Sequence, residues 1–148
     1  MMEKLLIKGE GRERLQIILK EIVGFPQATS HFGGYDVVGR VEIASGNYYV
    51  NGELWLTTGE LYLLYKDLRK AYQECKGLVS YRNYEGNLEF NIGFMKLGQV
   101  EISGRYQERH DRANELIFNF CTDQSYLQET VEGLEGIHKK YGDMKGNK

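Results

Sequence analysis

The stretch from Leu54 to Tyr81, LWLTTGELYLLYKDLRKAYQECKGLVSY, decides the fold, because it places a helix between two strands. Its segment Thr57-Thr-Gly-Glu60 has the S/T-x-x-E form of a capping box, in which two side chains bond the free amides at a helix start. Apolar residues then recur at helical spacing. Lys76-Gly77 predicts the helix end, since glycine readily adopts the left-handed conformation found there.

The chain before this helix carries alternating strand and turn signals. Glu3–Lys8 and Val37–Ala44 predict strands, whereas Leu15–Val23 fits both helical spacing and strand alternation and stays ambiguous. Ser45-Gly46-Asn47 and Asn51-Gly52 are both turn signals. Because a period of two in the side chains continues through Asn51, we expect the turn at Ser45–Asn47, followed by one long strand.

The chain after this helix predicts an antiparallel meander and a second helix. Turn residues separate four strand-like runs, which are Leu78–Tyr84, Leu88–Phe94, Gln99–Tyr106 and Glu115–Cys121. Ser125-x-x-Gln128 has the form of another capping box. We therefore expect an α+β fold, a mostly antiparallel sheet of seven to eight strands with one central and one C-terminal helix. Residues 1–141 would form a single domain and residues 142–148 a flexible tail.

Composition limits the function classes. The chain has 148 residues and a net charge of −2, from 19 basic and 21 acidic residues spread along it, so no basic stripe predicts nucleic-acid binding. No apolar run approaches the ~20 residues of a membrane span, and the N-terminal run is too short for a secretory signal. Cys75 and Cys121 are isolated, which fits a reducing compartment. We expect a cytoplasmic protein.

No catalytic or metal-binding motif emerges. His31, His110 and His138 lack a histidine or cysteine at zinc-ligand spacing, and no phosphate-binding or dinucleotide motif predicts a cofactor. His110 beside Asp111 could act as the oriented general base of a hydrolase. Neighbours on an extended chain point to opposite faces, however, and QERHDRAN, residues 107–114, reads better as a solvated hairpin loop. We therefore predict no enzyme.

The tyrosines indicate a binding surface. The chain has eleven, more than one core face would hold, and tyrosine is enriched at protein interfaces. Together with the loop charges they predict these partner-binding residues: Tyr48, Tyr49, Tyr81, Tyr84, Tyr106, Arg109, His110 and Asp111.

The segments LWLTTGELYLLYKDLRKAYQECKGLVSY, GQVEISGRYQ, LIFNFCTDQSYL and above all Asp123–Leu127 resemble the WapI-type immunity proteins of bacterial polymorphic toxin systems. The likeness covers about residues 36 to 141, and more weakly the N-terminal strands. It implies a small cytoplasmic protein that binds and neutralises a cognate toxin domain without catalysis, and it favours a strand at Leu15–Val23. The segment QERHDRAN departs from the family pattern, so it could carry partner specificity or be an insertion.

A second hypothesis belongs to another function class. A curved sheet covered by helices can enclose an apolar cavity, so the chain could instead be a small-molecule-binding or structural α+β module of unknown ligand.

Overall fold

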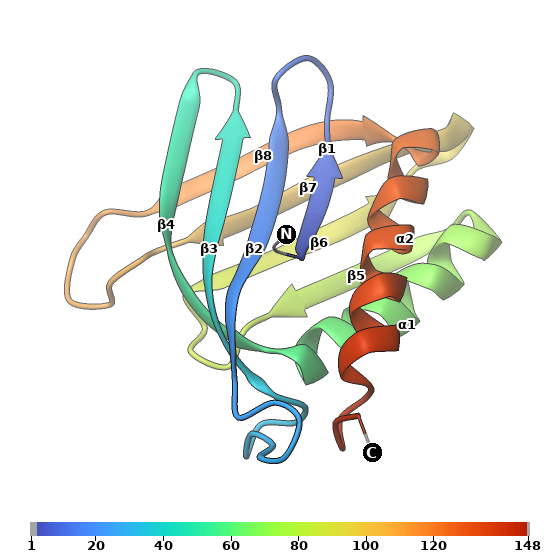
Figure 1. Ribbon diagram of the computed structural model, residues 1–148. Helices are drawn as coiled ribbons and strands as arrows, with labels where there is room; N and C mark the ends of the chain where they lie inside the picture. Colours follow the sequence, from blue (N-terminus) through green and yellow to red (C-terminus); the bar gives the residue numbers. More distant parts are fainter. Residues whose placement is uncertain (1–2, 148) are drawn as a thin grey trace.

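The computed structural model describes residues 3–147 and contains eight strands and two helices (Figure 1). The first antiparallel sheet has the order β1 (Lys4–Lys8), β2 (Arg14–Val23), β3 (Asp36–Ser45), β4 (Tyr48–Thr57). The second has the order β5 (Gly77–Arg82), β6 (Leu88–Phe94), β7 (Gln99–Tyr106), β8 (Leu116–Asp123). Helix α1 spans Thr58–Glu74 and α2 spans Gln124–Tyr141, and a 3-10 turn, Lys96–Gly98, joins β6 to β7.

The predicted α+β class, with eight antiparallel strands and a central and a C-terminal helix, is confirmed. The strands divide into two sheets because α1 separates β4 from β5. A helix of 17 residues carries the chain about 25 Å, so the next strand begins away from the edge of the first sheet. Hairpin connections then pair the remaining strands with their sequence neighbours.

The two sheets enclose one core, and the helices close one side of it (Figure 1). The alternation of side chains along a strand decides which of them enter the core. In β6, Leu88, Phe90 and Ile92 are buried, and the residues between them face outward. The helices run antiparallel, because Gln124 at the start of α2 bonds the carbonyl of Tyr72 near the end of α1. Helix α2 also covers the free edge of β1, where the Thr130 hydroxyl donates to the Leu6 carbonyl at 2.7 Å.

The ambiguous segment is the strand β2, as the family resemblance favoured. Leu15, Ile17 and Leu19 point into the core and are at most 2% exposed. Burial of every second side chain therefore favours the strand over the helix for this segment. The predicted turn is confirmed: Ser45, the last residue of β3, pairs with Tyr48, the first residue of β4. The predicted long strand after it, β4, is also confirmed.

Both helix starts use side-chain caps, but two predicted positions were wrong. The capping box of α1 is confirmed, with reciprocal bonds of 3.1 and 3.2 Å between Thr57 and Glu60. This helix ends at Cys75 (φ 57°) and not at Gly77, because Gly77 already pairs in β5. Helix α2 is capped by Asp123, whose carboxylate accepts from the Ser125 amide at 2.9 Å, so Ser125 lies inside the helix.

The residues after α2 contact the β2–β3 loop. The Met144 carbonyl accepts from the Gly34 amide, and the Asn147 amide donates to the Tyr35 hydroxyl. The flexibility of residues 142–148 and the single-domain boundary at 141 stay predictions, and Met1, Met2 and Lys148 lie outside the described residues.

Candidate functional site

The connection between β7 and β8, residues 107–115, projects beyond the sheets on the side away from the helices (Figure 1). We call it the tip loop. It contains Arg109, His110 and Asp111 of the predicted binding residues, all exposed. Its charge predicted a solvated hairpin loop, yet the residues at its two ends are bonded to the sheet and to neighbouring turns.

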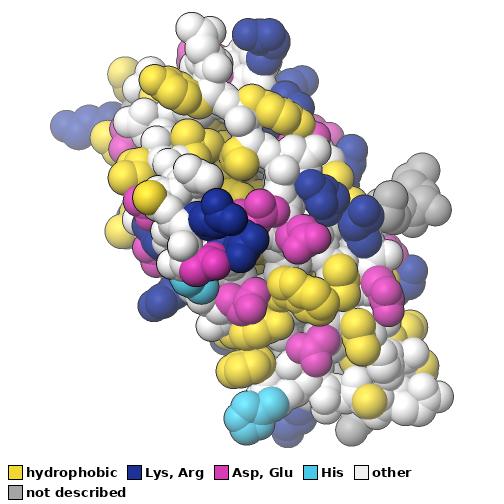
Figure 2. Space-filling view, turned by 90° about the vertical axis from the view of Figure 1, so that its left-hand side faces the viewer, with side chains coloured by type: hydrophobic (Ala, Val, Ile, Leu, Met, Phe, Trp, Pro, Cys, Tyr) yellow, Lys and Arg dark blue, Asp and Glu magenta, His cyan; other side chains and the backbone are white. Residues whose placement is uncertain are grey.

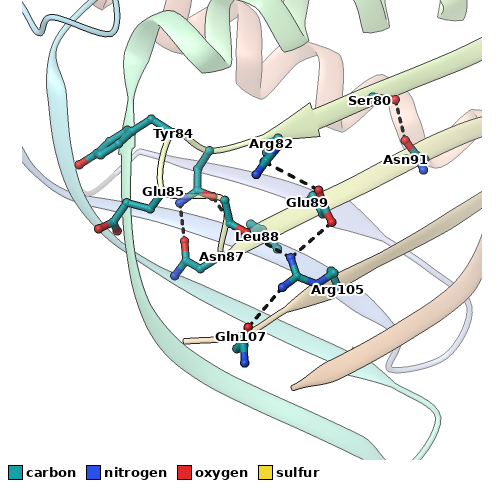
Figure 3. A network of polar contacts seen from close by, with 12 residues as sticks. Ser80, Arg82, Tyr84, Glu85, Asn87, Leu88, Glu89, Asn91, Arg105 and Gln107 are labelled. Atoms are coloured by element: carbon teal, nitrogen blue, oxygen red, sulfur yellow. Dashed lines mark hydrogen bonds and ion pairs between the residues drawn. The ribbon is translucent and has the colours of Figure 1, made fainter. Parts of the chain in front are cut away.

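Arg105, the residue on β7 just before the buried Tyr106, anchors both ends of the tip loop, and Figure 3 shows its contacts with Gln107 and Glu89. Its guanidinium donates to Glu115 at 2.7 Å and to Gln107 at 3.3 Å, the last and first residues of the loop. It also donates to the Gly86 carbonyl at 3.1 Å and lies 3.3 Å from Glu89. The hydrogen bond to Glu115 raises the pKa of Arg105, so its charge is held firmly in this network.

Strand register builds the rest of this network on the outer face of the second sheet. Arg82, Glu89 and Arg105 lie side by side on β5, β6 and β7, and Glu89 contacts both arginines. In the next row the Ser80 hydroxyl donates to Asn91 at 2.6 Å (Figure 3). The side chains of these two rows line an open hollow of about 540 Å³. Its lining combines charged and polar side chains with apolar surface, and it faces away from the core.

The histidine and the acid of the tip loop do not form a catalytic pair. His110 Nε2 lies 3.1 Å from the carbonyl oxygen of Glu85, in the β5–β6 turn. Asp111 instead bonds Arg109 twice, at 2.8 and 3.0 Å, and these bonds lower the pKa of the Asp111 carboxyl. The general-base arrangement considered for a hydrolase is therefore not formed, and the tip loop rests on the β5–β6 turn.

The base of the tip loop blocks the free edge of β4. The Tyr106 hydroxyl donates to the Glu53 carbonyl at 2.5 Å, and the Glu53 amide donates to Glu108 at 2.7 Å. Asn83, from the β5–β6 turn, donates to the Trp55 carbonyl at 2.9 Å. Backbone groups that could pair with another strand are thus used to hold the loop. Tyr106 itself is 2% exposed, and burial raises its pKa.

The β5–β6 turn is fixed in turn by Glu60 of α1. Its carboxylate accepts from the Tyr84 amide at 2.8 Å and from the Tyr81 hydroxyl at 3.1 Å, besides closing the capping box with Thr57. Burial raises the pKa of Glu60 to about 7. Tyr81 is 4% exposed, so its ring belongs to the core.

Exposed aromatic side chains lie beside the tip loop. The rings of Phe32 and Tyr84 stack with centroids 4.5 Å apart and planes 7° apart, and Trp55 is 44% exposed on β4. Figure 2 views the molecule from this side and shows hydrophobic side chains beside acidic ones over the centre and lower part of the face. We call the tip loop with Phe32, Trp55 and Tyr84 the tip-loop face.

The predicted residues thus fall into three groups. Tyr84, Arg109, His110 and Asp111 come together on the tip-loop face. Tyr48 and Tyr49 are 71% and 57% exposed at the start of β4, next to the β3–β4 turn and apart from the tip loop. Tyr81 and Tyr106 are buried, so the surface that a partner can contact does not include them.

Sequence reasoning missed Phe32 and Trp55 as surface residues and Arg105, Glu108 and Glu60 as anchors. For Trp55 a signal existed: Leu54 and Leu56 enter the core, so the residue between them must face outward. Tyr106 likewise shares its face with the buried Ile102. The anchors had no such signal, because no local pattern shows which side chains the strand pairing brings together.

Within residues 3–147, no three His, Cys, Asp or Glu side chains converge as metal ligands. Neither helix described has the length and apolar composition that a membrane crossing requires.

Comparison with known proteins gives one match. Residues 5–142 match the Immunity protein WapI-like family, which is nearly the whole chain. No curated protein and no solved structure matches the chain. The match includes both sheets, both helices and the tip loop. The chain therefore belongs to the WapI-like immunity protein family.

Proposed function

We propose that this protein binds a cognate bacterial toxin domain through the tip-loop face and neutralises it by occlusion. Family membership supports an immunity role and a protein partner. The observation that carries the choice of surface is the anchoring of the tip loop by Arg105, Glu108 and His110. A loop that is already ordered loses little conformational entropy when a partner binds it.

The side chains on this face suit protein recognition. Tryptophan, tyrosine and arginine dominate binding energy in protein interfaces, and Trp55, Tyr84 and Arg109 are exposed here. The stacked pair Phe32 and Tyr84 presents a large rigid surface. Tyr48 and Tyr49 form a second, smaller patch, which we include in the proposal as an additional contact.

The proposal extends to the setting. The protein would act in the cytoplasm of a bacterium that carries a polymorphic toxin system, without a cofactor, and would catalyse no reaction. It would contact neither nucleic acid nor membrane. Neutralisation would follow from covering the toxin's active site.

The alternative of a small-molecule-binding module with an apolar cavity has less support. Aromatic and aliphatic side chains from both sheets and both helices fill the space between them, as the buried cluster that includes Tyr35, Phe90 and Leu134 illustrates. The hollow of about 540 Å³ lies outside this core, on the outer face of the second sheet, and is open to solvent.

Co-expression with the cognate toxin domain tests the proposal. We expect the protein to restore growth, and the triple variant Arg109→Ala/His110→Ala/Asp111→Ala to lose most of this protection. The matched control is Glu135→Ala/Lys139→Ala, which removes an exposed ion pair of 3.2 Å on α2. Unchanged toxicity with the wild-type protein would refute the immunity role. Full protection by the triple variant would refute the choice of surface.

A further inference from the structure

Both helices lie on the side of the molecule away from the tip loop (Figure 1), and residues of both line a second surface hollow. Its volume is about 380 Å³. Lys66, Arg69 and Lys70 of α1 line it, together with Tyr62, Tyr65 and His138. We call it the helix groove. Its volume is within the range of small-ligand sites.

The helix groove is basic and has no acidic lining residue. No carboxylate among residues 3–147 forms an ion pair with Lys66, Arg69 or Lys70. Glu135 on the facing helix is paired with Lys139. In a chain of net charge −2, three cations therefore converge on one hollow without a counter-charge of their own.

These cations repel one another along the helix that carries them. Lys66 lies three and four residues before Arg69 and Lys70, spacings at which like charges repel on a helix surface. Cations stabilise the last turn of a helix, where they meet the negative end of its dipole, but the last turn of α1 has no basic residue. Asp67 and Glu74, three and four residues from Lys70, and the Tyr62 ring, 6.0 Å from the Lys66 ammonium, offset part of this repulsion. An anionic ligand would offset the remainder.

The floor of the helix groove is ordered. The ring of His138 lies 5.1 Å from that of Tyr62 and 5.4 Å from that of Tyr65, and its Nδ1 lies 3.1 Å from the Gly142 carbonyl oxygen. Tyr65 is 8% exposed, so its ring is part of the core. The aromatic rings hold the two helices together at this point, and the three cations stand around a fixed base.

We propose that the helix groove binds a compact polyanion of the phosphate-ester class. A guanidinium matches two phosphate oxygens at once, and ammonium groups act as mobile point charges beside it, which assigns the central contact to Arg69. A hollow of this size between two helices suits a diphosphate-sized group better than an extended acidic chain. The inference is independent of toxin binding, because the site is on the opposite side of the molecule.

Calorimetric titration of the full chain at low salt tests the proposal, with inorganic pyrophosphate as the probe and inorganic phosphate and a hexaglutamate peptide for comparison. We expect saturable binding of one pyrophosphate per chain, and weaker binding of phosphate. The double variant Lys66→Gln/Arg69→Gln should weaken pyrophosphate binding at least about tenfold, since it removes two charged hydrogen-bond donors. Arg69→Lys keeps the positive charge but loses the two-pronged guanidinium, so it should weaken pyrophosphate binding less than the double variant does.

The matched control is Lys20→Gln/Lys96→Gln, which makes the same change in net charge at two exposed positions outside the groove. It should bind pyrophosphate like the wild type. All the exchanged side chains are exposed, and a thermal melt of each variant checks that it folds. Three results would overturn the proposal: no saturable heat, an equal loss in the control, or hexaglutamate binding as tightly as pyrophosphate, which would make the groove a docking site for acidic polypeptide.

Discussion

Each sheet ends in a hairpin, and the two hairpins differ in how they are held. The β3–β4 connection is a turn at Gly46 and Asn47, and the tyrosines after it are more than half exposed. The β7–β8 connection is the tip loop, whose residues are bonded to β4, to the β5–β6 turn and to Arg105. The longer connection is the one with more restraints outside its own hairpin.

The difference separates two ways of presenting side chains to a partner. The short turn has two long-range restraints, from the Gly46 amide to Glu13 at 2.8 Å and from the Ser45 hydroxyl to the Asn119 carbonyl at 2.7 Å. The exposed Tyr49 side chain donates to Glu42 at 3.0 Å and lies under Arg14, whose guanidinium is 6.0 Å from the ring centroid. At the tip loop, more such restraints act, on the loop itself and on the β5–β6 turn beneath it. Substitutions at the anchors should therefore change both stability and recognition, whereas substitutions of Tyr48 and Tyr49 should change recognition alone.

The largest expected effect comes from removing the ring at the base of the tip loop. Tyr106→Ala should destabilise the protein by about 3–5 kcal/mol, because it empties a buried site and frees the Glu53 carbonyl. Tyr48→Ala, at a side chain that is 71% exposed, should change the free energy of unfolding by less than about 0.5 kcal/mol. Urea denaturation of the two variants gives both numbers.

Tyr106→Phe isolates the hydrogen bond to Glu53. It keeps the ring and should cost about 1 kcal/mol. Equal losses for Tyr106→Ala and Tyr48→Ala would contradict the distinction between the two hairpins.

The next effect concerns Glu60, which holds the β5–β6 turn under the tip loop. Burial raises its pKa from 4.5 to about 7, so the folded state binds a proton more tightly than the unfolded state does. The associated stability is fully present below pH 4.5 and is lost as the pH rises through about 7. Its total is roughly 3 kcal/mol. Glu60→Gln should remove this pH dependence, which denaturation at pH 4.5, 6 and 8 would measure.

The comparison must use the slope with pH, because Glu60→Gln also replaces an oxygen that accepts from the Tyr84 amide. Other carboxyls act in the opposite direction. The hydrogen bond from Arg14 lowers the pKa of Glu42, whose contribution is lost as the pH falls below 4.5. Glu42→Gln is therefore the control, and it should leave the slope between pH 4.5 and 8 unchanged. Identical slopes for the wild type and Glu60→Gln would exclude a buried carboxyl of raised pKa.

Much of the fold follows from local patterns in the sequence. Strict alternation placed β6, and the capping box at Thr57 placed α1, because both signals act within a few residues. Alternation also separates Trp55, which faces outward, from Tyr81 and Tyr106, which share a face with buried neighbours. The division into two sheets was not predicted, since it depends on where α1 delivers the chain.

The candidate site was predictable only in part. Its exposed charges are visible in the segment QERHDRAN, but the carboxylates and carbonyls that anchor the loop lie 10 to 55 positions from their partners. Arg105 contacts Glu89 because the register of β6 and β7 places the two residues opposite each other. A shift of β7 by one residue would point the Arg105 side chain into the core. Such partners are set by tertiary structure, and a single sequence carries no local trace of them.

The smallest effect tests whether the Arg105 network orders the tip loop. Arg105→Gln should cost about 1–2 kcal/mol, because it loses two carboxylate contacts at a side chain that is 29% exposed. Amide hydrogen exchange should accelerate in residues 107–115. Arg82→Gln is the matched control: its single contact to Glu89 spans 3.9 Å at 71% exposure, so it should cost less than about 0.5 kcal/mol and leave exchange in the loop unchanged. If both variants left exchange unchanged, the order of the tip loop would have to come from Glu108 and His110 alone, and Arg105 would be one more charge on a solvated sheet face.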